Sequence, residues 1–153
     1  MEKLQIPFRV HSTGWLLLVF CLSLGVMIDG PRLGLFFGVM AVLSLLLHEA
    51  GHMLAAAFLG VPVREFGLRL AGAYIRRAYA ATQQDEVLIA TAGPLMNFCL
   101  ILPLSFVPIL GHQLALCNLA LGLVNLLPIP SSDGMRILRA LRSSVAPGPL
   151  NQN

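Results

Sequence analysis

Four long stretches of the chain carry no Asp, Glu, Lys or Arg, and they constrain the fold more than any other feature. The stretches are residues 10–28, 33–48, 50–63 and 87–132. A run of about 18 or more apolar residues is long enough to cross the hydrocarbon core of a bilayer. Of all residues, 57% are hydrophobic and 11% are charged, which is far more apolar than a soluble domain. The sequence therefore predicts an α-helical integral membrane protein.

Glycine and proline residues that interrupt helices divide this apolar sequence into about four transmembrane helices. The predicted helices cover residues 14–28, 33–59, 87–108 and 114–127. An Asp-Gly-Pro turn at residues 29–31 separates the first two helices, and Gly60 ends the second. We expect a single membrane-embedded domain over residues 1–142, followed by a short flexible tail over residues 143–153.

Residues 63–80 differ in kind from the predicted helices. Phe66, Leu68 and Leu70 alternate with other residues, which is the period of a β-strand. Gly72 can turn the chain into a second short run of the same kind. We therefore expect a small β-hairpin at the membrane surface, between the second and third helices.

The cationic residues are distributed unevenly across this predicted topology. Nine of the ten fall on one side: Lys3, Arg9, Arg64, Arg69, Arg76, Arg77, Arg136, Arg139 and Arg142. Arg32 lies on the other side. Cytoplasmic loops of membrane proteins carry such an excess of positive charge, so both termini and the hairpin should face the cytoplasm. The net charge of +3 then reflects topology, and we expect a lipid bilayer and no nucleic acid as partner.

The run LLLHEAGHMLA at residues 45–55 places three ionisable side chains inside a predicted membrane helix. His48 and His52 are four residues apart, so they share one helix face and can bind a single metal ion. Glu49 lies beside them and can act as a general base. His-Glu-x-x-His is the arrangement of zinc peptidases. The same three residues could instead form a polar contact between helices, or a proton relay in a transporter.

A hydrolytic zinc site needs a third protein ligand, with the fourth position left to water. Asp133 follows Pro128 and Pro130, which must interrupt the helix. Irregular backbone at membrane depth is tolerated only where protein or water covers it. His48 lies about 22 Å along its helix from Leu33, which places it in the cytoplasmic half of the bilayer. The fourth predicted helix also runs toward the cytoplasm, so Asp133 near its end reaches a similar depth. Asp133 is therefore the predicted third ligand. The alternative is a helix cap or Asx turn, because residues 131–134 are all turn formers.

Three motifs in this order resemble the site-2 protease family of intramembrane zinc metalloproteases, in the compact form of its sporulation-factor-processing branch. HEAGH resembles the first family signature, and NLLPIPSSDG resembles the pattern N-x-x-P-x-x-x-x-D-G. AGPLMNF resembles the G-P-x-x-N element. The resemblance covers about residues 40–140. The family often has Gly-Gly-Arg after the aspartate, where this chain has Gly134, Met135 and Arg136.

The resemblance implies a role for each matched residue. His48, His52 and Asp133 would bind Zn²⁺. The carboxylate that follows His48 would activate water and pass its proton to the leaving amine. Asn125 and Asn97 would bind substrate backbone or help polarise the scissile carbonyl. The alternative for both asparagines is hydrogen bonding between helices.

The function implied is hydrolysis of a peptide bond in or near a transmembrane segment of a membrane-protein substrate, as in regulated intramembrane proteolysis. The hairpin resembles the family's membrane-associated strands, which can pair with an unwound substrate segment. The expected location is the inner membrane of a prokaryotic cell. Because the chain has so few predicted helices, a second copy of the chain or a regulatory membrane protein could complete the fold or control substrate access. Two other functions stay open: a catalytically silent relative that binds membrane segments, and a small transporter.

Overall fold

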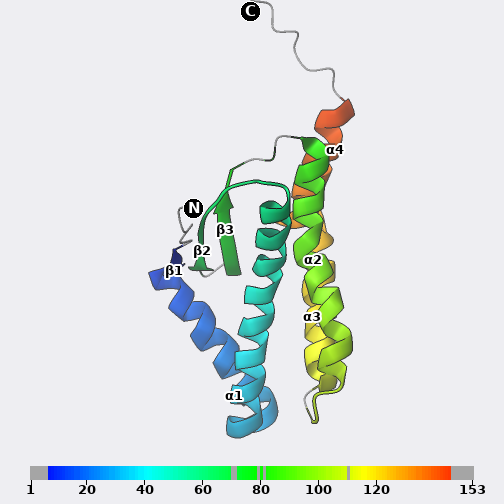
Figure 1. Ribbon diagram of the computed structural model, residues 1–153. Coiled ribbons are helices and arrows are strands. Elements are labelled where there is room, and N and C mark those ends of the chain that lie inside the picture. The colour runs from blue at the N-terminus through cyan, green and yellow to red at the C-terminus, as the bar shows by residue number, and fades with distance from the viewer. Residues whose placement is uncertain (1–6, 70–71, 79, 81, 110, 146–153) are drawn as a thin grey trace, which may run out of the picture.

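The computed structural model describes residues 7–69, 72–78, 80, 82–109 and 111–145. These residues form a mostly helical protein with a small sheet packed at one end (Figure 1). In chain order the elements are β1 Phe8–Val10, α1 Ser12–Phe58, β2 Val63–Arg69, β3 Gly72–Arg77, α2 Gln83–Ser105, α3 Gly111–Leu126 and α4 Asp133–Val145.

The long helix α1 covers the first two predicted helices and bends sharply between them. Gly30 leaves helical geometry with φ 76° and ψ 176°, and Pro31 follows it. The expected turn at residues 29–31 is therefore a kink that folds α1 back on itself (Figure 1). A Cβ at Gly25 would overlap the backbone carbonyl of Gly34, and the reverse also holds. The absence of side chains at both glycines lets the two arms pack closely, as small residues do between membrane helices.

The sheet has three strands in the order β1-β2-β3. Antiparallel β2 and β3 confirm the predicted hairpin, with Leu68 opposite Ala73. Gly72 is the first residue of β3 and pairs with Arg69, so it is not the turn residue that we expected. The parallel strand β1 was not predicted, because three residues are too few to show a period. This order leaves β3 at an edge of the sheet, on the side of α2 and α4 (Figure 1).

Two of the described helical segments are long and apolar enough to cross a membrane: Gly30–Phe58 and Gln83–Ser105. The helix α3 has 16 residues and is therefore about 24 Å long, somewhat short of a hydrocarbon core of about 30 Å. The structure thus supports a helical membrane protein with two candidate spans, where the sequence predicted about four.

The chain between α3 and α4 is irregular, as the prolines there predicted. Pro128 and Pro130 lie in this break, and Ser131 has a left-handed φ of 74°. The helix α4 that follows was not predicted, and it packs along α2 (Figure 1). It continues through Val145 and so includes the first three residues of the predicted tail, while residues 146–153 lie outside the described part of the chain.

Candidate metal centre

The second arm of α1 carries both predicted histidine ligands on one buried face. Their side chains come from consecutive turns, and their rings lie edge to face with centroids 4.9 Å apart. His48 is 5% exposed and His52 is 1% exposed. Two imidazoles one turn apart are thus directed together into the interior, where α1 meets α2.

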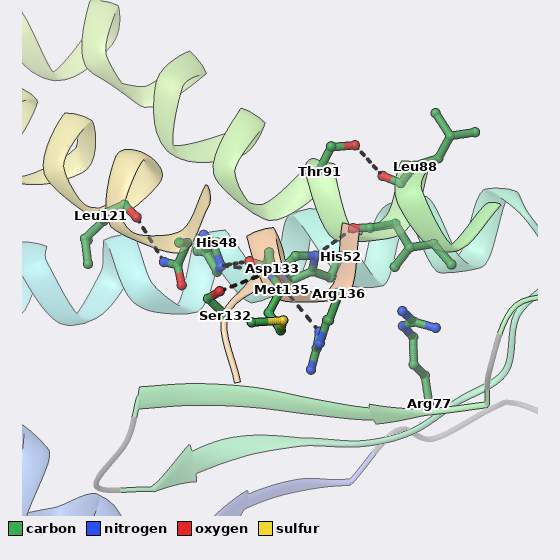
Figure 2. A network of polar contacts seen from close by, with 12 residues as sticks. His48, His52, Arg77, Leu88, Thr91, Leu121, Ser132, Asp133, Met135 and Arg136 are labelled. Atoms are coloured by element: carbon green, nitrogen blue, oxygen red, sulfur yellow. Dashed lines mark hydrogen bonds and ion pairs between the residues drawn. The ribbon is translucent and has the colours of Figure 1, made fainter. Parts of the chain in front are cut away.

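Asp133 reaches the same point from the start of α4 (Figure 2). Its Oδ2 lies 3.1 Å from Nε2 of His48 and 3.2 Å from Nε2 of His52. The cap of α4 is supplied by the preceding residue, because Oγ of Ser132 accepts a hydrogen bond from the Met135 amide at 3.1 Å. The Asp133 carboxylate is therefore not used as the cap and faces the two rings.

The three atoms form a nearly equilateral triangle, since the two Nε2 atoms are 3.3 Å apart. Zinc binds His nitrogen and carboxylate oxygen at about 2.0–2.1 Å, so neighbouring ligand atoms in a tetrahedron lie about 3.3 Å apart. The observed edges of 3.1, 3.2 and 3.3 Å fit one face of such a tetrahedron. The fourth corner remains for water or substrate.

The protonation pattern around His52 also fits a cation. Its Nδ1 lies 2.7 Å from the carbonyl oxygen of Ile89 on α2, to which it can only donate. In the neutral ring, Nε2 then carries a lone pair directed at the Asp133 carboxylate. Two acceptors at 3.2 Å repel each other unless positive charge lies between them. Such a backbone partner for the second ring nitrogen is typical of metal-binding histidines.

Gly93 on α2 leaves space beside the two rings. A Cβ there would overlap Nε2 of His52 and lie 2.8 Å from Nε2 of His48. Those are the two nitrogen atoms of the triangle. The glycine of the AGPLMNF motif thus lets α2 approach the two candidate ligand nitrogens closely.

Glu49 supplies a second carboxylate next to the triangle. One of its oxygens, one nitrogen of His48 and one nitrogen of His52 lie within 4.8 Å of one another. The Asp133 oxygen is nearer to both nitrogens, at 3.1 and 3.2 Å. Of the two carboxylates, Asp133 is therefore the better placed to be the third candidate ligand.

The surroundings of Asp133 favour its ionised form. One of its carboxylate oxygens faces the two histidine rings, and the other faces an arginine. Arg136, one turn along α4, places Nη1 3.5 Å from the other carboxylate oxygen, Oδ1 (Figure 2). The ionised form is the one that binds a metal.

Comparison with known proteins identifies a family and several related proteins. Residues 36–112 match the family described as Peptidase family M50. The chain is 34% identical to a zinc metalloprotease of Methanocaldococcus jannaschii over an alignment of 149 positions, which covers 90% of this chain and 43% of that protein. A solved structure, a site-2 protease from Methanocaldococcus jannaschii, superposes with a TM-score of 0.73 at 32% identity, covering 94% of this chain and 70% of that one.

The chain belongs to peptidase family M50. A further relative from Synechocystis is 30% identical over 89% of this chain and 41% of its own length. This M50 chain thus spans less than half of the curated relatives that it matches. The histidine motif lies inside the matched range, whereas Asp133 lies beyond it.

The two asparagines predicted to support substrate binding differ in this M50 chain. Asn125 is partly buried, and its Nδ2 donates to the Leu121 carbonyl oxygen at 3.0 Å. Asn97 is fully buried on α2, and neither its Nδ2 nor its Oδ1 has a partner among the described residues. The structure thus brings neither amide into hydrogen-bond contact with the histidines or Asp133 among the described residues.

Other residues of the M50 site were missed by sequence reasoning. The Ile89 carbonyl, the Ser132 cap and the open face at Gly93 all support the ligands. Gly93 was visible as part of a motif, and its role could have been suspected from that. A backbone carbonyl leaves no signal in the identity of its own residue, so Ile89 could not have been found.

Proposed function

We propose that this M50 chain is an intramembrane zinc metalloendopeptidase. It hydrolyses a peptide bond in or near a transmembrane segment of a membrane-protein substrate. The observation that carries the proposal is the triangle of His48 Nε2, His52 Nε2 and Asp133 Oδ2, whose edges of 3.1 to 3.3 Å suit a tetrahedral metal. Family membership and the names of the relatives support zinc as that metal.

The residues around the triangle have distinct roles in the proposed reaction. When bound, zinc polarises the scissile carbonyl and makes water acidic near neutral pH. Glu49 takes the proton from the attacking water and gives it to the leaving amine. The Ile89 carbonyl holds the His52 ring in one orientation. Asn125 and Asn97 help to hold the substrate backbone or polarise its carbonyl. Asn125 adjoins the irregular segment before α4, whereas Asn97 would have to leave its buried position.

The protein lies in a prokaryotic cell membrane with both termini and the sheet on the cytoplasmic side. Arginines on β2, β3 and α4 gather at the end of the molecule that holds the sheet. Arg32 follows the kink of α1, which lies far from the sheet (Figure 1). This asymmetry supports the orientation through the positive-inside rule.

A substrate helix must unwind before its peptide bonds can be cut, because its backbone groups are hydrogen-bonded to one another. The edge strand β3 lines the same cleft as α4, which carries Asp133. An unwound substrate segment can pair with such an edge by strand addition. The sheet would thus hold the scissile segment in extended form near the metal.

The decisive experiment compares the wild-type protein with the variant Glu49→Gln in liposomes that contain a single-span test substrate. We expect the wild type to cut the substrate within its span. The variant should keep its zinc but lose at least about a hundredfold in rate, which is the usual contribution of a general base. Cleavage by Glu49→Gln at the wild-type rate would refute the assigned base.

The same two preparations separate the proposal from its alternatives. A silent relative would bind the test substrate without cutting it in the wild type as well. A transporter or proton relay would purify without stoichiometric zinc. Metal analysis of the wild-type protein therefore distinguishes an enzyme from a relay, independently of which substrate is chosen.

A further inference from the structure

A cleft of about 1010 Å³ opens between β3, the start of α2 and α4. Its lining is strongly basic, with five arginines: Arg64, Arg76, Arg77, Arg136 and Arg139. Two acidic residues, Glu65 and Glu86, also line it. Arg136 belongs both to the cleft and to the metal centre, because it reaches the Asp133 carboxylate at 3.5 Å. The cleft is therefore adjacent to the candidate catalytic site.

Part of this charge is neutralised within the protein. Arg77 makes a two-point contact with Glu86, with N···O distances of 2.9 and 2.5 Å. Arg76 lies 3.7 Å from Glu65, whose pKa is lowered mainly by a hydrogen bond from the Tyr74 hydroxyl. These pairs use both of the acidic residues that line the cleft.

Two arginines of the cleft have no such partner among the described residues. Arg64 and Arg139 are exposed, and within the described part of the chain neither has a hydrogen bond or an ion pair. Arg64 comes from β2 and Arg139 from α4, so opposite walls of the cleft each carry a free guanidinium. Guanidinium groups are well suited to binding carboxylates, which accept two parallel hydrogen bonds.

We propose that this cleft binds acidic side chains in the segment that flanks the substrate's transmembrane helix. This inference rests on the proposed function and narrows its substrate class. Most membrane proteins carry Lys and Arg at their cytoplasmic flank. Those flanks would be repelled by the unpaired Arg64 and Arg139, so the cleft both attracts acidic flanks and rejects the commoner basic ones.

An acidic peptide fits the cleft better than a lipid headgroup. The edge strand β3 contributes consecutive residues to the lining, Ile75, Arg76 and Arg77. An extended peptide can use backbone groups of that edge and side-chain contacts with the arginines at the same time. A phosphate headgroup can use the arginines alone.

The test is a binding measurement that does not require cleavage. The Glu49→Gln protein in detergent is titrated into short fluorescent peptides that are identical except for several Asp, Asn or Lys residues. We expect anisotropy to report binding of the Asp peptide, weaker binding of the Asn peptide, and none of the Lys peptide. The double variant Arg64→Gln/Arg139→Gln should bind the Asp peptide about tenfold more weakly.

Arg142→Gln is the matched control, because Arg142 lies on α4 but does not line the cleft. It should leave peptide affinity unchanged. Equal affinity for the Asp and Asn peptides would overturn the proposal, as would an equal loss in Arg142→Gln. The comparison of the three peptides on the Glu49→Gln protein remains a valid test even if the double variant does not fold.

A second arm uses nanodiscs with and without anionic phosphatidylglycerol. Tight, Arg64- and Arg139-dependent binding of that lipid, with no preference for the Asp peptide, would assign the cleft to lipid and refute the peptide. Because these experiments measure binding, they can fail while cleavage of a test substrate succeeds. The reverse outcome would refute the proposed function and leave an acidic-peptide site.

Discussion

The metal centre and the basic cleft lie next to each other but differ in whether their charged side chains are paired and buried. In the metal centre, each titratable side chain faces another within a few ångströms, and His48, His52 and Asp133 are each at most 5% exposed. In the cleft, two arginines are exposed and without a partner among the described residues. Unpaired charge is costly in a buried site and tolerated where water reaches it. The centre is thus organised for one small cation, and the cleft for a larger anionic partner.

Removing one of the three candidate metal ligands should have the largest effect, because it affects the metal centre and not the cleft. Asp133→Ala leaves two imidazoles without their anionic partner, so zinc affinity should fall by more than about a hundredfold. The measurement is zinc content of the purified protein after dialysis against a mild chelator. Asp85→Ala, on the first turn of α2, is the control and should keep full zinc. Retention of zinc by Asp133→Ala would require another third ligand.

Adding a methyl group at Gly93 should cause the second-largest loss of zinc affinity. Gly93→Ala would force the added carbon onto Nε2 of His52, and overpacking costs about 1–3 kcal/mol. We expect zinc affinity to fall about tenfold to a hundredfold, while the helix content in circular dichroism stays unchanged. Thr91→Ala is the control on the same helix, because the Thr91 hydroxyl bonds only to carbonyls of α2. Normal zinc binding by Gly93→Ala would mean that α2 can move away.

The paired arginine of the cleft offers a third test. Glu86→Gln removes the anion that Arg77 contacts, and the side chains are 18% and 8% exposed. We expect a loss of about 1–3 kcal/mol in stability, seen as a lower thermal midpoint. Zinc content should not change, because the contact between Arg77 and Glu86 does not include any of the three candidate ligands. Affinity for an acidic peptide should rise, since the change removes one negative charge from the lining of the cleft.

The cap of α4 should have the smallest effect. Ser132→Ala removes the acceptor for the Met135 amide, which typically costs about 1 kcal/mol. We expect a small drop in thermal midpoint and at most a fewfold loss of zinc affinity. Ser132→Thr, which keeps the hydroxyl, should restore both. If Ser132→Ala abolished zinc binding, the cap would be essential for placing Asp133 and not merely stabilising.

The parts of the fold with a repeating local signal could be predicted from sequence. Apolar length indicated the helices, the proline and glycine signals indicated the kink at Gly30 and the break before Asp133, and alternation indicated β2 and β3. The strand β1 and the helix α4 were missed. Pairing of β1 depends on contact with β2, which is distant in sequence, by the registers Phe8 to Phe66 and Val10 to Leu68. The cleft was missed for the same reason, because its arginines come from three separate elements.

The sequence by itself determined that His48 and His52 share a face, because a helix repeats every 3.6 residues and a spacing of four returns to the same side. It also placed a helix break just before Asp133. Only the tertiary structure decided that the Asp133 carboxylate, 85 residues from His48, meets both rings at 3.1 and 3.2 Å. It also decided that Ile89 orients His52 and that Arg64 and Arg139 face one cleft. Helical periodicity is local, whereas these approaches depend on how α2 and α4 pack against α1 and the sheet.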